Sequence, residues 1–238
     1  MFVSKNSFIG VVCGLQSEAK AVRAACDSLH LRIGISGANA ERAEEITRAF
    51  CEDGANIVIS VGVSGGLDPS LLPGDLLISD AVCSASGDAF EVDEHLLATL
   101  RDAVPDARVA LLFGADEIIA DTQRKAKLFA DTSALAVDME SHAVARAAKA
   151  AGVPFLAIRA IADPSDRAMP PAALNAVAAD GSTRVLKTLG AAMRDPKQFP
   201  ALLKLGADSE AALKTLRRDL GAIAVSLLKT IDLEQKTP

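Results

Sequence analysis

The sequence has no tryptophan and no tyrosine, and its only large aromatic side chains are eight phenylalanines. Proteins that hold single-stranded nucleic acid stack successive bases on aromatic rings, so a surface of that kind is excluded, although one phenylalanine could still hold a single base. Positive charge is also scarce, because 25 basic residues stand against 31 acidic ones and the net charge is -6. This balance disfavours binding to a phosphate backbone. We therefore expect no nucleic-acid partner.

Cysteines are few and far apart, and Cys13, Cys26, Cys51 and Cys83 form no CxxC pair. The spacing predicts neither a zinc site nor a redox motif, and it is typical of reduced thiols in a cytoplasmic protein. No apolar run approaches the roughly 20 residues that a membrane-spanning helix needs. We expect a cytoplasmic protein without a metal site.

Short apolar runs rich in Val and Ile alternate with amphipathic, Ala-rich stretches along the first part of the chain. This alternation predicts an α/β fold in a single domain, with a largely parallel sheet that helices cover on both faces. We expect strands at 8–15, 31–36, 56–63, 75–82, 107–114, 134–138 and 154–162. We expect helices at 17–29, 40–54, 93–103, 121–130, 139–151 and 171–193.

After Arg194 the sequence has no strand-like run, and residues 195–238 look like a helical appendage. Apolar residues recur there at spacings of three and four, which predicts a helix with one apolar stripe: Leu213, Leu216, Leu220, Ile223, Leu227 and Ile231. Basic residues lie off the stripe: Lys214, Arg217, Arg218 and Lys229. Two interpretations stay open. The helix could rest on the surface of the inner membrane as a peripheral contact, or it could pack on its own domain or on a partner subunit.

Three acidic residues follow predicted strands, namely Glu18, Glu140 and Asp163. Ligands of open α/β sheets bind beyond the carboxyl ends of the strands. Each residue alone also has a structural interpretation, because Glu18 and Glu140 suit the first turn of a helix and Asp163 precedes Pro164 in a turn. All three at one edge of one sheet predict a binding site.

A glycine cluster at 61–69 also ends a predicted strand, and Ser64, Gly65 and Gly66 within it could let a ligand approach the backbone closely. The cluster has neither the GxGxxG pattern of dinucleotide enzymes nor the Lys of a phosphate-binding P-loop. It therefore gives little support to a dinucleotide enzyme.

Several of these pieces together resemble the nucleoside phosphorylase and nucleosidase superfamily, and in particular its methylthioadenosine/S-adenosylhomocysteine nucleosidase branch. The resemblance covers most of residues 8–193. It rests on the early strand before Glu18, SG at 36–37, VGVSGGLDPSLLPGDLLISD at 61–80, VDMES at 137–141 and RAIAD at 159–163. It implies a three-layer fold with a central mixed, largely parallel sheet flanked by helices, in which 1–194 form the catalytic domain and 195–238 a helical extension. It also implies a homodimer or larger homo-oligomer.

The resemblance assigns a role to each carboxylate. Asp163 would protonate or hydrogen-bond N7 of a departing purine, Glu18 would orient and activate the attacking water, and Glu140 would hold the ribose hydroxyls. Further implied contacts are Met139 beside the sugar, Glu117, Ile118 and Ala162 beside the purine, and Asp138 as a supporting residue. Breaking an N-glycosidic bond places positive charge on the sugar and negative charge on the base, so an acid near the base and carboxylates near the sugar both lower the barrier. Asp163 must then be protonated, which requires a raised pKa.

Hydrolysis is favoured over phosphorolysis, because a carboxylate at Glu18 would repel phosphate. Arg23, Arg42 and Arg159 keep phosphorolysis open, although surface positions or a structural ion pair explain each equally well. We expect no cofactor, with phosphate as the one candidate co-substrate.

Some features depart from the methylthioadenosine branch, namely Asn39 after the SG pair, Ala162 in place of a Ser, and the helical tail. The tail, together with SVGVSGGLDP, VDMESHAVA and RAIADPSDRAMPP, makes the chain resemble the hopanoid-associated phosphorylases, which implies release of adenine from adenosylhopane. A lipid-linked adenine nucleoside would also suit the apolar loop with Met169, Pro170 and Pro171. The alternatives are a soluble methylthioadenosine or adenosylhomocysteine nucleosidase and a non-catalytic nucleoside-binding protein.

Two further residues are singled out. His142 lies two positions after Glu140, and neighbours two apart on a helix point away from each other, so we expect a satisfied helix histidine and not a catalytic one. Phe90 is a candidate contact across a subunit interface or beside the base.

Overall fold

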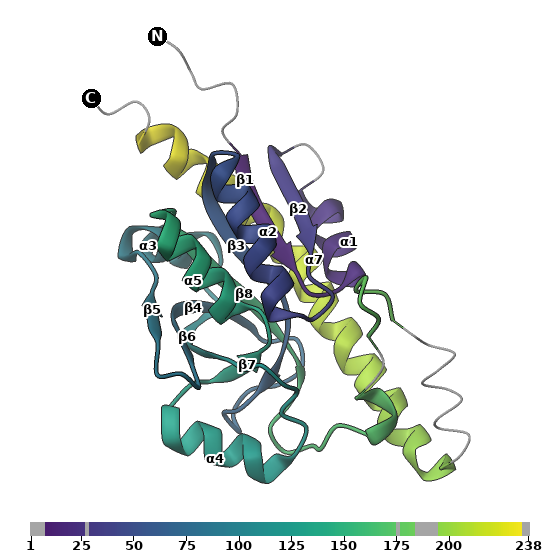
Figure 1. Ribbon diagram of the computed structural model, residues 1–238. Helices are drawn as coiled ribbons and strands as arrows, with labels where there is room; N and C mark the ends of the chain where they lie inside the picture. The colour runs from purple at the N-terminus through teal and green to yellow at the C-terminus, as the bar shows by residue number, and fades with distance from the viewer. Residues whose placement is uncertain (1–7, 27–28, 175–176, 184–194, 235–238) are drawn as a thin grey trace.

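The computed structural model describes residues 8–26, 29–174, 177–183 and 195–234 (Figure 1). The strands are β1 (Phe8–Cys13), β2 (Leu31–Ile35), β3 (Ala55–Gly66), β4 (Leu76–Ser84), β5 (Ala89–Glu91), β6 (Arg108–Gly114), β7 (Ala136–Asp138) and β8 (Phe155–Asp163). The helices are α1 (Gln16–Ala25), α2 (Ala40–Glu52), α3 (Glu94–Ala103), α4 (Thr122–Thr132), α5 (Ser141–Ala151) and α7 (Phe199–Glu234), with 3-10 turns η1 (Pro171–Ala173) and η2 (Pro196–Gln198).

The strands predicted from apolar runs are buried in the structure. β1 and β8 are buried along their whole length, as near-continuous apolar runs in a sheet covered on both faces require. Side-chain caps mark where several helices begin, because their oxygens accept from otherwise unpaired backbone N–H groups. Asn39 accepts from the N–H of Arg42 at 2.8 Å at the start of α2. Asn39 is therefore the N-terminal cap of α2.

The eight strands form one mixed sheet with the order β2-β1-β3-β7-β6-β4-β5, and β8 pairs with both β3 and β4. Most neighbours are parallel, whereas β3–β7, β4–β8 and β4–β5 are antiparallel. The pairings β3–β8–β4–β6–β7–β3 return to their starting strand, so this part of the sheet closes into a ring. The predicted α/β class is confirmed, and the ring brings strands that are distant in sequence to one edge.

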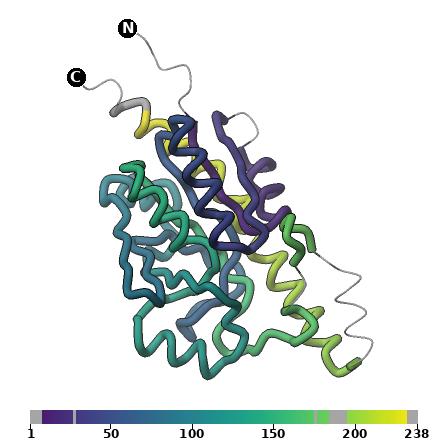
Figure 2. The backbone as a smooth tube through the Cα atoms, viewed as in Figure 1, coloured from purple at the N-terminus to yellow at the C-terminus, as the bar shows by residue number. Residues whose placement is uncertain are grey.

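Helices cover both faces of the sheet. α2 and α5 pack together over one face (Figure 1), where Val12 and Val58 meet Ala43 and Val144. α1, α3 and α7 lie against the other face, and their apolar residues join the largest core cluster. α4 covers a smaller hydrophobic cluster, which contains Leu67, Phe113 and Ala134. Figure 2 shows the course of the chain from α4 into the next elements, β7 and α5.

The long helix α7 lies along the body of the protein. Its predicted apolar stripe is part of the main core, since Leu216, Leu220, Ile223, Leu227 and Ile231 are buried there and Leu213 packs against it. Of the two interpretations of this helix, the structure supports packing on its own domain, because buried side chains cannot also enter a membrane surface. Among the described residues, no helix is both long enough and apolar enough to cross a membrane.

One predicted element is wrong. The helix predicted over 171–193 is absent from its described part, which contains the short η1 and an isolated bridge between Val177 and Thr183. Gly181 takes a positive φ of 77° within that bridge, so the chain turns back there. Residues 184–194 lie outside the described part. Phe90 is buried in the core on β5 with the ammonium of Lys149 above its ring, so its ring packs within its own subunit.

Candidate active site

The site is built around the end of β3. Gly65 pairs with Val137 of β7 on one side and with Asp163 of β8 on the other. β3 therefore places Asp163 opposite the short turn that carries Asp138 and Glu140. A Cβ added to Gly65 would lie 3.7 Å from the Oδ2 atom of Asp163, at ordinary van der Waals distance, so the end of β3 lies directly beside the carboxyl.

Glu18 is buried at the start of α1, where its carboxylate accepts two backbone hydrogen bonds. Its Oε2 accepts from the N–H of Leu15 at 2.8 Å, and its Oε1 accepts from the N–H of Val63 at 2.8 Å. Burial raises the pKa of Glu18, while these two hydrogen bonds act in the opposite direction. A buried carboxylate with a raised pKa is a better proton acceptor than an exposed one, which suits a general base.

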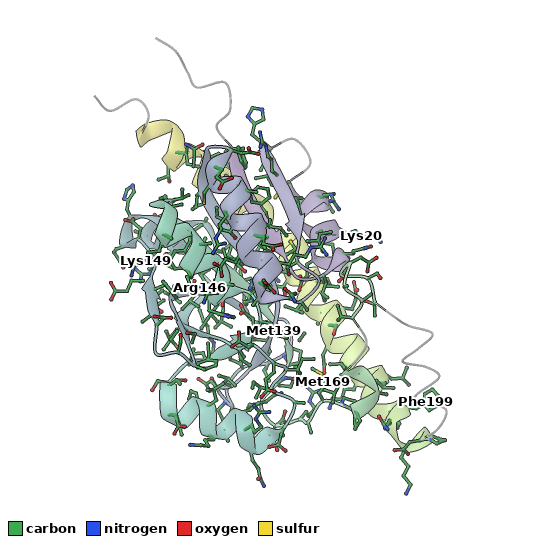
Figure 3. All side chains as sticks on the ribbon, in the orientation of Figure 1. Lys20, Met139, Arg146, Lys149, Met169 and Phe199 are labelled. Atoms are coloured by element: carbon green, nitrogen blue, oxygen red, sulfur yellow. The ribbon has the colours of Figure 1, made fainter. Side chains whose placement is uncertain are left out.

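Glu140 lies beside Glu18, as the resemblance implied for two residues of one site. A Cβ added to Gly14 would lie 2.6 Å from Oε1 of Glu140 and 3.5 Å from Oε2 of Glu18, so both carboxylates border the same small space. Burial, and then the charge of Asp138, raise the pKa of Glu140 to about 8. Met139 precedes it, half-buried (Figure 3).

Asp138 stabilises the junction between β7 and α5. Its Oδ1 accepts from the backbone N–H and the hydroxyl of Ser141 at 3.0 and 2.7 Å, which fixes the first turn of α5. Its Oδ2 binds Nε of Arg159 at 2.5 Å. Asp138 therefore supports the turn that carries Glu140, in keeping with its predicted supporting role.

Arg159 is buried beneath the site and is fully engaged by protein groups. Besides Asp138, its guanidinium donates to the carbonyl oxygens of Ser60 and Ile158 and to the hydroxyl of Ser60. Arg42 is exposed and donates to the carbonyl of Ala179 at 2.9 Å, and Arg23 is exposed on α1. The structure thus favours the structural ion pair as the interpretation of Arg159.

Asp163 ends β8 almost fully buried, and its Oδ2 binds the ammonium of Lys125 at 2.6 Å. Burial raises the pKa of Asp163, although the Lys125 cation opposes this. Lys125 is not among the site residues predicted from the sequence. It stands among Arg124 and Lys127 on α4, and only the three-dimensional packing shows which of these basic side chains is buried.

The segment predicted to contact the purine lies against the loop that follows Asp163. The N–H of Met169 donates to the carbonyl of Ala120 at 2.9 Å, which joins the segment containing Glu117 and Ile118 to the loop that follows Asp163. The side chain of Glu117 is exposed and pairs with Arg124, so a base contact from this residue would have to use its backbone. Ile118 is half-buried and Ala162 is buried within β8.

Ser64 lies on β3 between Val63, which binds Glu18, and Gly65, which pairs with Asp163. Strand alternation places Ser64 on the same face of β3 as Gly62, and a Cβ on Gly62 would lie 2.7 Å from Glu18. Gly66, at the strand end, pairs with Ala136 of β7. The Oγ atom of Ser64 is buried without a hydrogen-bond partner among the described residues.

His142 is buried on α5 against Gly114, and its Nε2 lies 3.2 Å from Asp116. Its Nδ1 has no partner in the described part of the chain, so only one of its two nitrogens is satisfied. The four cysteines are free thiols. No group of three or more His, Cys, Asp or Glu side chains within the described ranges is placed to hold a metal ion.

Comparison with known proteins adds a family to this geometry. The profile described as "Phosphorylase superfamily" matches residues 24–193. The 5'-methylthioadenosine/S-adenosylhomocysteine nucleosidase of Staphylococcus saprophyticus is 29% identical over 132 residues, which are 47% of this chain and 58% of the relative. The chain thus aligns with little more than half the length of that relative.

Solved structures show the same fold. A futalosine hydrolase mutant of Helicobacter pylori superposes with a TM-score of 0.70 at 17% identity, covering 91% of this chain and 98% of that one. The S-adenosylhomocysteine nucleosidase of Streptococcus pyogenes, in complex with 5-methylthiotubericidin, gives a TM-score of 0.69 at 16% identity, with 95% and 99% covered. At such low identity, these superpositions establish the shared architecture.

Proposed function

The chain belongs to the phosphorylase superfamily, and on that premise we propose that it cleaves the N-glycosidic bond of adenine nucleosides, with water as the attacking group. The placement of Glu18 is the observation that favours water over phosphate as the attacking group. Its carboxylate already occupies the backbone N–H groups of Leu15 and Val63. An anion such as phosphate would need donors of this kind, and it would be repelled by the carboxylate that holds them.

The proposed reaction uses one carboxyl on each side of the bond. Glu18 accepts a proton from water as the water oxygen bonds to C1′ of the sugar. The bond between C1′ and the purine breaks, its electron pair passes to the base, and the proton of Asp163 moves to N7. Glu140 holds the ribose hydroxyls by hydrogen bonds and so keeps C1′ in line between the water and the departing base. The products are adenine and the free sugar.

Replacing each reacting carboxyl separately tests this assignment. Asp163→Asn and Glu18→Gln should each lower kcat for adenine release by about 10²- to 10⁴-fold, the usual contribution of a positioned acid or base. KM should change much less, because the shape of the site is kept. Asp131→Asn, at an exposed ion pair on α4, is the matched control and should keep the wild-type rate. Adenine release that survives both substitutions would refute the roles, whereas wild-type protein that binds the nucleoside without releasing adenine would favour a nucleoside-binding protein.

We further propose that the nucleoside carries an apolar group, with adenosylhopane as the substrate. Exposed apolar side chains support this proposal. Leu174, beyond the loop that follows Asp163, is 39% exposed, and Leu203 on the first turns of α7 is 74% exposed. The two regions are tied together, because the N–H of Ala172 donates to the side chain of Gln198 at 3.0 Å. In the view of Figure 3, Met139, Met169 and Phe199 follow one another from the middle of the protein toward the start of α7.

A charge placed on this apolar surface distinguishes the lipid-linked substrate from a soluble one. Leu203→Glu should reduce kcat/KM for adenosylhopane by about tenfold, because the removal of one large apolar contact costs roughly 1.5 kcal/mol or more. The same variant should leave methylthioadenosine unaffected. Equal effects on both substrates, or a wild-type preference for methylthioadenosine, would support the alternative of a soluble methylthioadenosine/S-adenosylhomocysteine nucleosidase.

A further inference from the structure

Lys125 carries a buried ammonium group beside the proposed acid. Its side chain is 0% exposed, and its Nζ atom donates to Oδ2 of Asp163 at 2.6 Å and to the carbonyl oxygens of Pro164 and Arg167 at 3.0 and 3.1 Å. An ammonium has three protons and no lone pair. All three protons are therefore used, and the two loop carbonyls fix the position of the charge.

This arrangement makes the two oxygens of Asp163 unequal. Oδ2 faces a group that can only donate, so a proton carried on Oδ2 would point at another proton. A proton taken up by the carboxyl must therefore reside on Oδ1, to which none of the described residues donates a hydrogen bond. Because Oδ2 is held by α4, the direction in which Oδ1 points is also fixed.

We propose that Lys125 is the positioning residue of the acid: it holds Oδ2 of Asp163, so that the transferable proton is carried on Oδ1 and directed at the departing base. The proposal rests on the proposed function, because it requires Asp163 to protonate a leaving group. Lys125 touches no reacting atom and acts through Asp163 alone.

The charges around Asp163 give the proposal a measurable pH signature. Burial raises the pKa of this carboxyl, the cations of Lys125 on α4 and Arg167 on the loop lower it, and Asp208 on α7 raises it. Arg167 and Asp208 form an ion pair with each other, so Lys125 is the cation without a second anionic partner. Removing its charge raises the pKa of Asp163. The protonated acid then persists to higher pH, and the basic limb of the kcat/KM profile moves upward.

The experiment compares Lys125→Met, which keeps the length of the side chain without its charge, with wild type on two substrates. One is methylthioadenosine, whose base must be protonated to leave, and the other is a nitrophenyl riboside, whose leaving group departs without protonation. Lys125→Met should lose about 10- to 100-fold in kcat on methylthioadenosine, as displacement of a catalytic group by about 1 Å does. It should keep its rate on the riboside, and its basic limb should lie at higher pH.

Two further variants complete the test. Lys125→Gln keeps a donor of similar length without the charge, so it should show the same shift of the basic limb with a smaller loss of kcat, and it serves if the methionine variant does not fold. Lys127→Met, exposed on the same helix, should match wild type throughout. Equal losses on both substrates with an unchanged basic limb would overturn the proposal and leave Lys125 as a structural cation. Wild-type protein that releases no adenine would instead overturn the proposed function, and this inference with it.

Discussion

Replacement of Arg159 by methionine should destabilise the protein strongly, because a buried carboxylate would lose its counter-charge. Arg159 and Asp138 have side chains that are almost completely buried, and their ion pair is 2.5 Å long. Methionine fills similar space but donates no hydrogen bond, so Asp138 Oδ2 and the carbonyl of Ser60 would lose their donor. Breaking a buried pair from one side costs about 3–5 kcal/mol. For a chain of this size, that corresponds to a fall in Tm on the order of 10 °C.

Thermal unfolding followed by calorimetry measures this loss of stability. Two further variants serve as controls. Arg159→Met combined with Asp138→Asn should recover part of the loss, because Asn removes the charge and keeps an oxygen for Ser141. Arg146→Met breaks a surface ion pair with Glu44 and should cost only about 0–1 kcal/mol. A Tm for Arg159→Met as high as that of Arg146→Met, or a double variant that simply adds both losses, would refute the reasoning.

Two other predictions concern the carboxylates of the site. Glu140 has its pKa raised to about 8 by burial first and then by Asp138, so the folded state keeps a proton that the unfolded chain releases near pH 4.5. The stability of wild type relative to Glu140→Gln should therefore fall as pH rises from about 4.5 to 8, by up to about 1.4 kcal/mol per pH unit; parallel denaturation curves across this window would contradict it. Gly62→Ala would bring a methyl group within 2.7 Å of Oε1 of Glu18, and displacing this base should lower kcat by about 100-fold. Gly206→Ala, in open space on α7, is its matched control and should keep full activity with a gain of about 0.5–1 kcal/mol in stability; equal kinetics for the two alanine variants would show that the position of Glu18 is unimportant.

Most strands could be predicted from the sequence, because buried parallel strands leave short apolar runs that amphipathic stretches separate. The ends of these runs also pointed to Glu18, Glu140 and Asp163. The closed ring could not be predicted, since the antiparallel pairing of β8 with β4 joins segments about 80 positions apart and depends on the whole packed sheet. The three-residue β5 was missed because AFE is too short to show a pattern.

Other errors came from properties that exist only after folding. Lys125 lies in a basic, helical stretch typical of a solvated surface, yet its ammonium is buried against Asp163. The apolar character of 171–183 suggested a helix, but Pro170 and Pro171 restrict the backbone there and the Asp180–Gly181 pair turns it back. The apolar stripe of α7 was correctly identified, whereas the surface that it covers could be seen only in the structure.

Adenine release from adenosylhopane and from methylthioadenosine, each with and without phosphate and with the sugar product identified by mass spectrometry, distinguishes hydrolysis from phosphorolysis at this site. We expect adenine and a free sugar at a rate that phosphate does not change, with adenosylhopane preferred. A phosphate-dependent rate with a sugar 1-phosphate as the product would contradict this expectation, because phosphate would then have to bind where Glu18 holds the backbone N–H groups of Leu15 and Val63.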